Sequence, residues 1–102
     1  MAFKITSVKT RYFEFEAPDN NRVLLLEPPK LKTLKKMEDI QKNKDAGIED
    51  LAALLARIIS KNKQQRKVSA DQVMDWMDMD QMREFTRAFL DWLKQEHKSD
   101  PN

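Results

Sequence analysis

The chain of 102 residues is 40% hydrophobic and 35% charged, so it can form one domain with a modest core beneath a charged surface. It has no cysteine, one histidine and one glycine, which argues against disulfides, thiol chemistry, a transition-metal site and phosphate-binding loops. Its apolar runs are short and its first residues lack the apolar stretch of a signal peptide, so we expect a cytoplasmic protein without a membrane span.

The N-terminal quarter of the chain is predicted to form strands. Residues 3–6 and residues 12–16 alternate between apolar and polar side chains, which is the period of a half-buried strand. Residues 18–21 contain proline, aspartate and asparagine, which favour a turn. Residues 22–27 then predict a return strand, and two prolines end it. Two or three strands are marginally stable alone, so this sheet must pack on helices.

Helical spacing replaces the alternation after the two prolines. Apolar residues recur at helical intervals over residues 31–40 and again over residues 48–59. Gly47 lies at the break between these segments, where we expect it to take a left-handed conformation. A basic polar connector, residues 61–67, leads out of the second helix.

Two more helix starts are predicted in the acidic segment that follows. Ser69 and Gln72 fit a capping box, in which each side chain bonds to the other residue's backbone N–H. Asp80 is a suitable cap for the last helix, because its carboxylate can accept from free N–H groups at the positive helix end. One face of that last helix carries Met82, Phe85, Phe89 and Trp92.

Together these patterns predict an α+β fold, with a small N-terminal antiparallel β-sheet followed by a bundle of about four helices. We expect a single domain over residues 1–98, with a β segment at 1–27 and a helical part at 30–98. Residues 99–102 are expected to form a disordered tail.

Catalysis is not expected. The aspartates near the methionines suit helix caps and a solvated face. No glycine lies among them, as the turn of a calcium-binding loop would require. The spacing of the serines indicates no base that could activate them. We therefore predict a protein that is not an enzyme and that uses no metal or cofactor.

Charge is unevenly distributed along the chain. Residues 1–67 carry a net charge of +6 and residues 68–102 a net charge of −4. Such a division is compatible with head-to-tail self-association and equally with ordinary variation among surface helices. The basic residues at 30–36 and 61–67 are candidates for phosphate contacts, but no recognition helix accompanies them and basic faces alone give only nonspecific affinity.

Methionine is concentrated in one stretch of the sequence. Four of the six methionines lie between Ser69 and Phe85, beside Trp76. Methionine is flexible and polarizable, so it suits surfaces that accept partners, but methionine and tryptophan at helical spacing are also ordinary core residues. The sequence leaves both interpretations open.

The parts of the chain follow a specific order. A strand segment ends at the Leu-Glu-Pro-Pro junction of residues 26–29, and two amphipathic helices follow. Next come Val68-Ser-Ala-Asp-Gln-Val-Met-Asp-Trp-Met-Asp78 and the aromatic helix of residues 82–93. Over about residues 10–96 this order resembles the tail assembly chaperones of long-tailed (siphovirus-type) bacteriophages.

This resemblance implies a function in virion assembly. Such a chaperone binds the tape measure protein, which is long, helical and apolar, and keeps it soluble in the host cytoplasm until tail tube subunits polymerise around it. In many such phages a frameshift fuses a second domain to this one, and the longer form would reach the tail tube protein; this chain would be the short form. The alternatives are a small nucleic-acid-binding regulatory protein and a structural tail or head-tail connector subunit.

A groove between helices lined by methionine and aromatic side chains could accept many amphipathic helices by repacking, although a closed core would use the same residues. The candidate partner-binding residues are Leu51, Leu55, Ile58, Met74, Trp76, Met77, Met79 and Met82.

Overall fold

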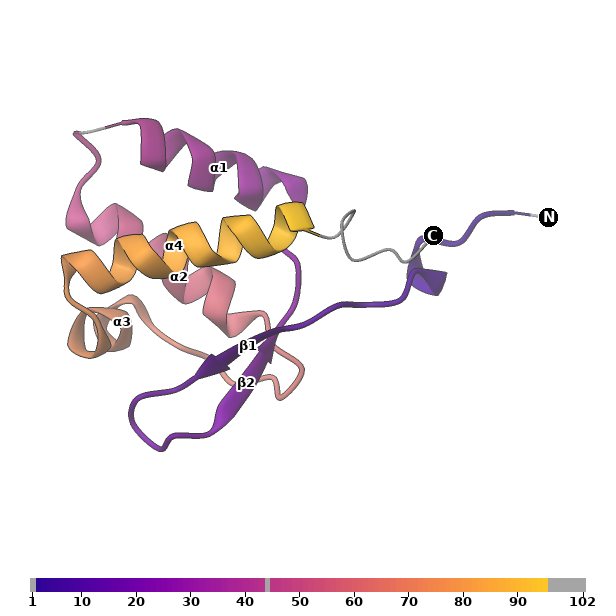
Figure 1. Cartoon of the computed structure of the whole chain (residues 1–102), viewed down its shortest axis with the longest axis horizontal. Helices are drawn as coiled ribbons and strands as arrows, with labels where there is room; N and C mark the ends of the chain where they lie inside the picture. The colour runs from indigo at the N-terminus through magenta and orange to yellow at the C-terminus, as the bar shows by residue number, and fades with distance from the viewer. Residues whose placement is uncertain (1, 44, 96–102) are drawn as a thin grey trace.

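A computed structural model describes residues 2–43 and 45–95 (Figure 1). In this part of the chain a two-stranded antiparallel sheet precedes four helices, which confirms the predicted α+β fold. Strand β1 (Phe13–Glu16) pairs with β2 (Val23–Leu26) in a register that sets Phe13 opposite Leu26. The alternation seen in the sequence is realised in β1, whose phenylalanines are half-buried and whose glutamates are exposed.

The strand predicted at residues 3–6 is not formed. Residues Ile5–Ser7 instead make a short 3-10 helix, η1, and Phe3 and Ile5 are exposed. An alternating segment becomes a strand only where a neighbour supplies hydrogen bonds and a surface to cover. Here the Ser7 N–H bonds locally to the Lys4 carbonyl at 3.0 Å, and no strand pairing reaches these residues.

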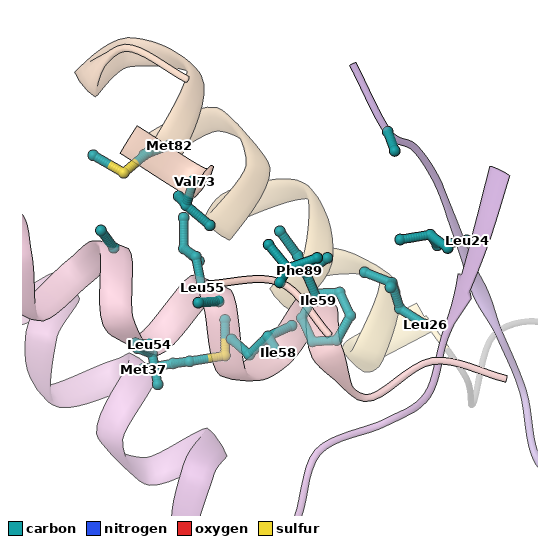
Figure 2. Packing of buried hydrophobic residues seen from close by; sticks show 14 of the residues in the cluster. Leu24, Leu26, Met37, Leu54, Leu55, Ile58, Ile59, Val73, Met82 and Phe89 are labelled. Carbon is teal, nitrogen blue, oxygen red and sulfur yellow. The ribbon is translucent and has the colours of Figure 1, made fainter. Parts of the chain in front are cut away.

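Four helices follow the sheet: α1 (Leu31–Lys42), α2 (Ile48–Ser60), α3 (Ala70–Trp76) and α4 (Met79–Lys94). Helix α2 is central, since it contacts α1, α3, α4 and β2. Figure 1 shows α1 and the sheet at opposite sides of the molecule with α2 and α4 between them. The core therefore forms around α2, where Ile59 lies close to Phe89 of α4 and Leu26 of β2 (Figure 2).

The basic connector after α2 is part of the sheet layer rather than a free loop. Its Lys63 N–H donates to the Leu25 carbonyl, and its Lys61 carbonyl accepts from the Glu27 N–H, both at 2.9 Å. Asn62 forms an isolated bridge with Leu26 between these two bonds. The connector therefore covers the edge of β2 that does not face β1.

Two local expectations about helix starts are corrected. The Ser69–Gln72 capping box is present, but α4 is capped by Asp78 and not by Asp80. The Asp78 carboxylate accepts from the Gln81 N–H, and the Gln81 amide oxygen accepts from the Asp78 N–H, both at 2.8 Å. Asp80 lacks such a partner because Arg83, three residues further on, has no side-chain acceptor.

Gly47 does not take a left-handed conformation. Its φ is −74° and its backbone is extended, because it is the residue that enters α2 rather than the residue that ends α1. The turn before it is made by Asn43, whose side-chain oxygen accepts from the Asp45 N–H at 2.9 Å. The tail predicted at 99–102, and the end of the helical part at 98, lie outside the described residues.

Candidate partner-binding groove

Three of the predicted partner-binding residues are core residues. Leu55, Ile58 and Met82 are almost completely buried, with Met82 2% exposed. Figure 2 shows Met82 close to Val73 and to Leu55, where α2, α3 and α4 meet. Their positions on the inner faces of α2 and α4 put them out of reach of a partner in this structure, so the expectation that they form the contact surface is corrected.

Three others lie at α3, away from the groove described below. Trp76 is half-buried against Phe15 of β1, with ring centroids 6.3 Å apart, and the Arg66 guanidinium lies 5.4 Å from its ring centroid. Met77 is half-buried, and Met74 is 37% exposed. Trp76 therefore fixes α3 to the sheet, and Met74 is the most exposed of the three.

The remaining two, Leu51 and Met79, line a groove. It has a volume of about 730 Å³ and lies between the C-terminal end of α1, the start of α2 and the first half of α4. It exists because α1 and α4 both pack on α2, while the described loop residues that line the space, Asn43, Ala46 and Gly47, are small or polar. Its lining residues are Ile40, Gln41, Lys42, Asn43, Ala46, Gly47, Ile48, Leu51, Met79, Arg83, Thr86 and Arg87.

The apolar part of this groove is contributed by three helices. Ile40 comes from the end of α1, Leu51 from α2 and Met79 from the start of α4, and all three are half-buried against the core. Ile48, the first residue of α2, is 53% exposed. An exposed isoleucine beside three half-buried apolar side chains gives a continuous apolar surface that an apolar ligand can cover.

The charged part of the lining has a single sign. Lys42, Arg83 and Arg87 are cationic, and no acidic residue lines the groove among the residues that the structure describes. Arg87 pairs with Glu84 on α4 at 2.5 Å, and this hydrogen bond raises the pKa of Arg87. In the described part of the chain Lys42 and Arg83 make no ion pair. The groove therefore combines an apolar floor with two cations that make no ion pair within the described residues.

Sequence reasoning missed most of these lining residues. On α4 the signal was present, because Met79, Arg83, Thr86 and Arg87 are separated by four, three and one residues and so share one helix face. The contributions of Ile40, Ala46 and Ile48 could not be found in this way, since they lie on other elements that meet α4 only in the tertiary structure.

An aromatic cluster elsewhere serves the fold. Phe13 of β1 packs edge-on against Phe85, Phe89 and Trp92 of α4, with ring centroids 5.3–5.9 Å apart. The Arg11 guanidinium lies 4.3 Å from the Trp92 ring centroid. These contacts fix the sheet to α4, so the aromatic face of the last helix is an internal surface rather than a ligand site.

The basic connector is partly neutralised within the molecule. Arg66 makes a two-point ion pair with Asp19, and this hydrogen bonding lowers the pKa of the Asp19 carboxyl. Lys61 donates from Nζ to the Pro28 carbonyl at 2.6 Å. These contacts hold the connector and the β1–β2 turn in place, and they reduce the charge available for phosphate contacts at this end of the molecule.

Neither a metal-binding cluster nor a membrane span is found in residues 2–43 and 45–95. Within them no three His, Cys, Asp or Glu side chains are grouped so that they could hold a metal ion. No helix there has the length and hydropathy that crossing a membrane requires. Comparison of the chain with models of protein families gave no match, and neither did comparisons with curated proteins and with solved structures.

Proposed function

We propose that this protein is a tail assembly chaperone of a long-tailed bacteriophage, which binds amphipathic helical segments of the tape measure protein in the groove between α1, α2 and α4. It would keep that partner soluble in the host cytoplasm until tail tube subunits polymerise around it. The observation that carries the proposal is the apolar floor of the groove, which remains open beside a closed core.

The floor has the properties that helix binding requires. An amphipathic helix presents apolar side chains at every third or fourth position, and it docks by placing them in an apolar groove. The α4 side of the groove runs from Met79 to Arg87, which is about 12 Å along the helix axis and corresponds to roughly two turns of a bound helix. Met79 is flexible enough to adjust to different partner side chains, which suits a partner that offers many similar segments.

The location of the groove also suits a reversible binder. Its floor consists of half-buried side chains at helix ends, whereas the centre of α2 is covered by the other elements. A partner could therefore cover Ile48, Leu51 and Met79 without opening the core. A chaperone that must later release its partner benefits from a site that requires little rearrangement.

The test is co-expression of the protein with segments of a tape measure protein, followed by measurement of the soluble fraction and of binding to the purified segments. Ile48→Glu replaces an apolar side chain on the floor of the groove with a polar one, and we expect it to weaken binding by at least about tenfold, because the apolar stripe of the partner would then cover a polar group. The matched control is Leu31→Glu, which makes the same kind of change at the first residue of α1, where the side chain is 81% exposed and does not line the groove.

Both substitutions should leave the melting temperature of the free protein almost unchanged, since both side chains are exposed. If the wild-type protein solubilises no tape measure segment, the proposed function is wrong. If Ile48→Glu and Leu31→Glu bind equally well, the chaperone function can stand but the groove is not its site. Steeply salt-dependent binding to duplex DNA would support the nucleic-acid alternative instead.

A further inference from the structure

The positions of the cations in the groove determine which charge a bound helix should carry. Lys42 projects from the last turn of α1, and Arg83 and Arg87 lie one turn apart on α4, so the three cations come from two sides of the apolar floor. Arg87 has Glu84 as a partner, but Lys42 and Arg83 have no ion pair within the described residues. An uncompensated cation beside an apolar surface favours an anionic group on whatever covers that surface.

Two exposed apolar segments of this chain carry positive charge, like the groove. Phe3, Ile5 and Val8 are exposed in residues 2–10, which carry Lys4 and Lys9 and no acidic residue. Leu31, the most exposed apolar residue of α1, is likewise flanked by lysines. Any of these segments entering the groove of another copy would bring lysine close to Arg83, which is unfavourable.

From these two observations we infer that the groove is selective for acidic amphipathic helices, whose apolar stripe covers Ile48, Leu51 and Met79 while flanking Glu or Asp side chains pair with Arg83 and Lys42. The same cations exclude basic helices, including the lysine-bearing segments around Phe3 and Leu31 of other copies of this chain. This inference rests on the proposed function, which identifies the partner as a helical segment of a tape measure protein. It adds that the bound segment must be acidic.

The expected discrimination follows from the exposure of the cations. Lys42 and Arg83 are exposed, so each ion pair with a partner carboxylate contributes only modestly and is screened by salt. Two or three such pairs together should make binding about tenfold tighter for an acidic helix than for a neutral helix with the same apolar stripe. Replacing those acids with lysines turns attraction into repulsion, so a basic helix should bind more weakly than the neutral one.

The experiment uses three designed helical peptides of the same length and with the same leucine stripe, flanked by glutamate, glutamine or lysine. Their dissociation constants with the full chain are measured by fluorescence anisotropy at low and at high salt. The order should be glutamate tightest and lysine weakest at low salt, and the differences should shrink at high salt. Arg83→Glu combined with Lys42→Glu should reverse the order, so that the lysine peptide binds best.

A matched control separates the groove from the overall charge of the protein. Lys35→Glu combined with Lys32→Glu makes the same number of charge reversals on exposed residues that do not line the groove. This control should keep the order of the wild-type protein. If it changes the order as much as the groove variant does, the preference comes from net charge and the inference is wrong.

The remaining outcomes distinguish this inference from the proposed function. If all three peptides bind equally well and Ile48→Glu abolishes their binding, the groove is a helix site but its cations do not select the partner, and the inference alone fails. If no peptide binds while a tape measure segment is still solubilised, the groove is not the site and the inference fails with it. If neither peptides nor tape measure segments bind, both the inference and the proposed function are rejected.

Discussion

Asn62 is a buried polar side chain at the point where the connector meets β2, and its removal tests the fold directly. It is 5% exposed. Its Nδ2 donates to the carbonyls of Ile59 at 2.7 Å and Arg66 at 2.8 Å, and its Oδ1 accepts from the Arg66 N–H at 2.9 Å. Asn62→Ala removes all three hydrogen bonds and leaves three backbone groups without these partners.

The magnitude follows from the burial of those groups. A hydrogen bond contributes about 1 kcal/mol net, and leaving a buried group unpaired costs more than that. Because the Arg66 groups are only half-buried, water can replace part of the loss, so we expect a decrease of about 2–3 kcal/mol in the free energy of unfolding. This is a large share of the roughly 5–15 kcal/mol that holds a domain folded.

The measurement is urea unfolding followed by tryptophan fluorescence, with Gln64→Ala as the control. Gln64 also bonds to the sheet, through the Leu25 N–H and the Val23 carbonyl at 3.1 Å, but it is exposed, so its loss should cost less than about 1 kcal/mol. The amide of Lys63 should also exchange faster with solvent in Asn62→Ala, because its bond to β2 depends on the connector position. Equal destabilisation by the two substitutions would refute the reasoning.

Three further predictions concern other positions. Asp78→Ala should lower the free energy of unfolding by about 1 kcal/mol, and Asp80→Ala by clearly less, because only Asp78 caps α4; thermal melts that rank them the other way would contradict the observed cap. Met82→Ala should destabilise the protein by about 2–5 kcal/mol by leaving a cavity in the core, and an unchanged melting temperature would show that this side chain is not buried. NMR titration should find the pKa of Asp19 below its usual 3.8, and Arg66→Ala should raise it toward that value, because the hydrogen bond from Arg66 is the largest cause of the lowering. Because the folded-state pKa is lowered, the stabilising contribution of this pair is present above that usual value and is lost as the pH falls below it; a titration unaffected by Arg66→Ala would exclude the pair.

The methionine-rich stretch shows where sequence reasoning reaches its limit. Met74 and Met82 have similar sequence surroundings, with acidic neighbours and helical spacing, but Met74 is exposed and Met82 is in the core. Periodicity says that residues share a helix face, but it does not say which face another element covers. The division of charge along the chain likewise does not decide between head-to-tail self-association and ordinary variation among surface helices.

The sequence by itself determined the type and approximate bounds of most elements. Alternation over residues 12–16, helical spacing over residues 48–59 and the Ser69–Gln72 pair are local signals, and local hydrogen bonding and side-chain direction are sufficient to realise them. The Asp78–Gln81 cap was equally readable, because it obeys the same three-residue spacing as the Ser69–Gln72 pair.

Only the tertiary structure decided which apolar residues form a surface. Leu51 and Met79 are far apart in the sequence, and they line one groove because α1 and α4 both pack on α2 without filling the space between them. Phe3 and Ile5 alternate like a strand but stay exposed, because no neighbouring strand pairs with them. In each case the result depends on what another element covers, and that depends on the packing of the whole chain rather than on the local sequence.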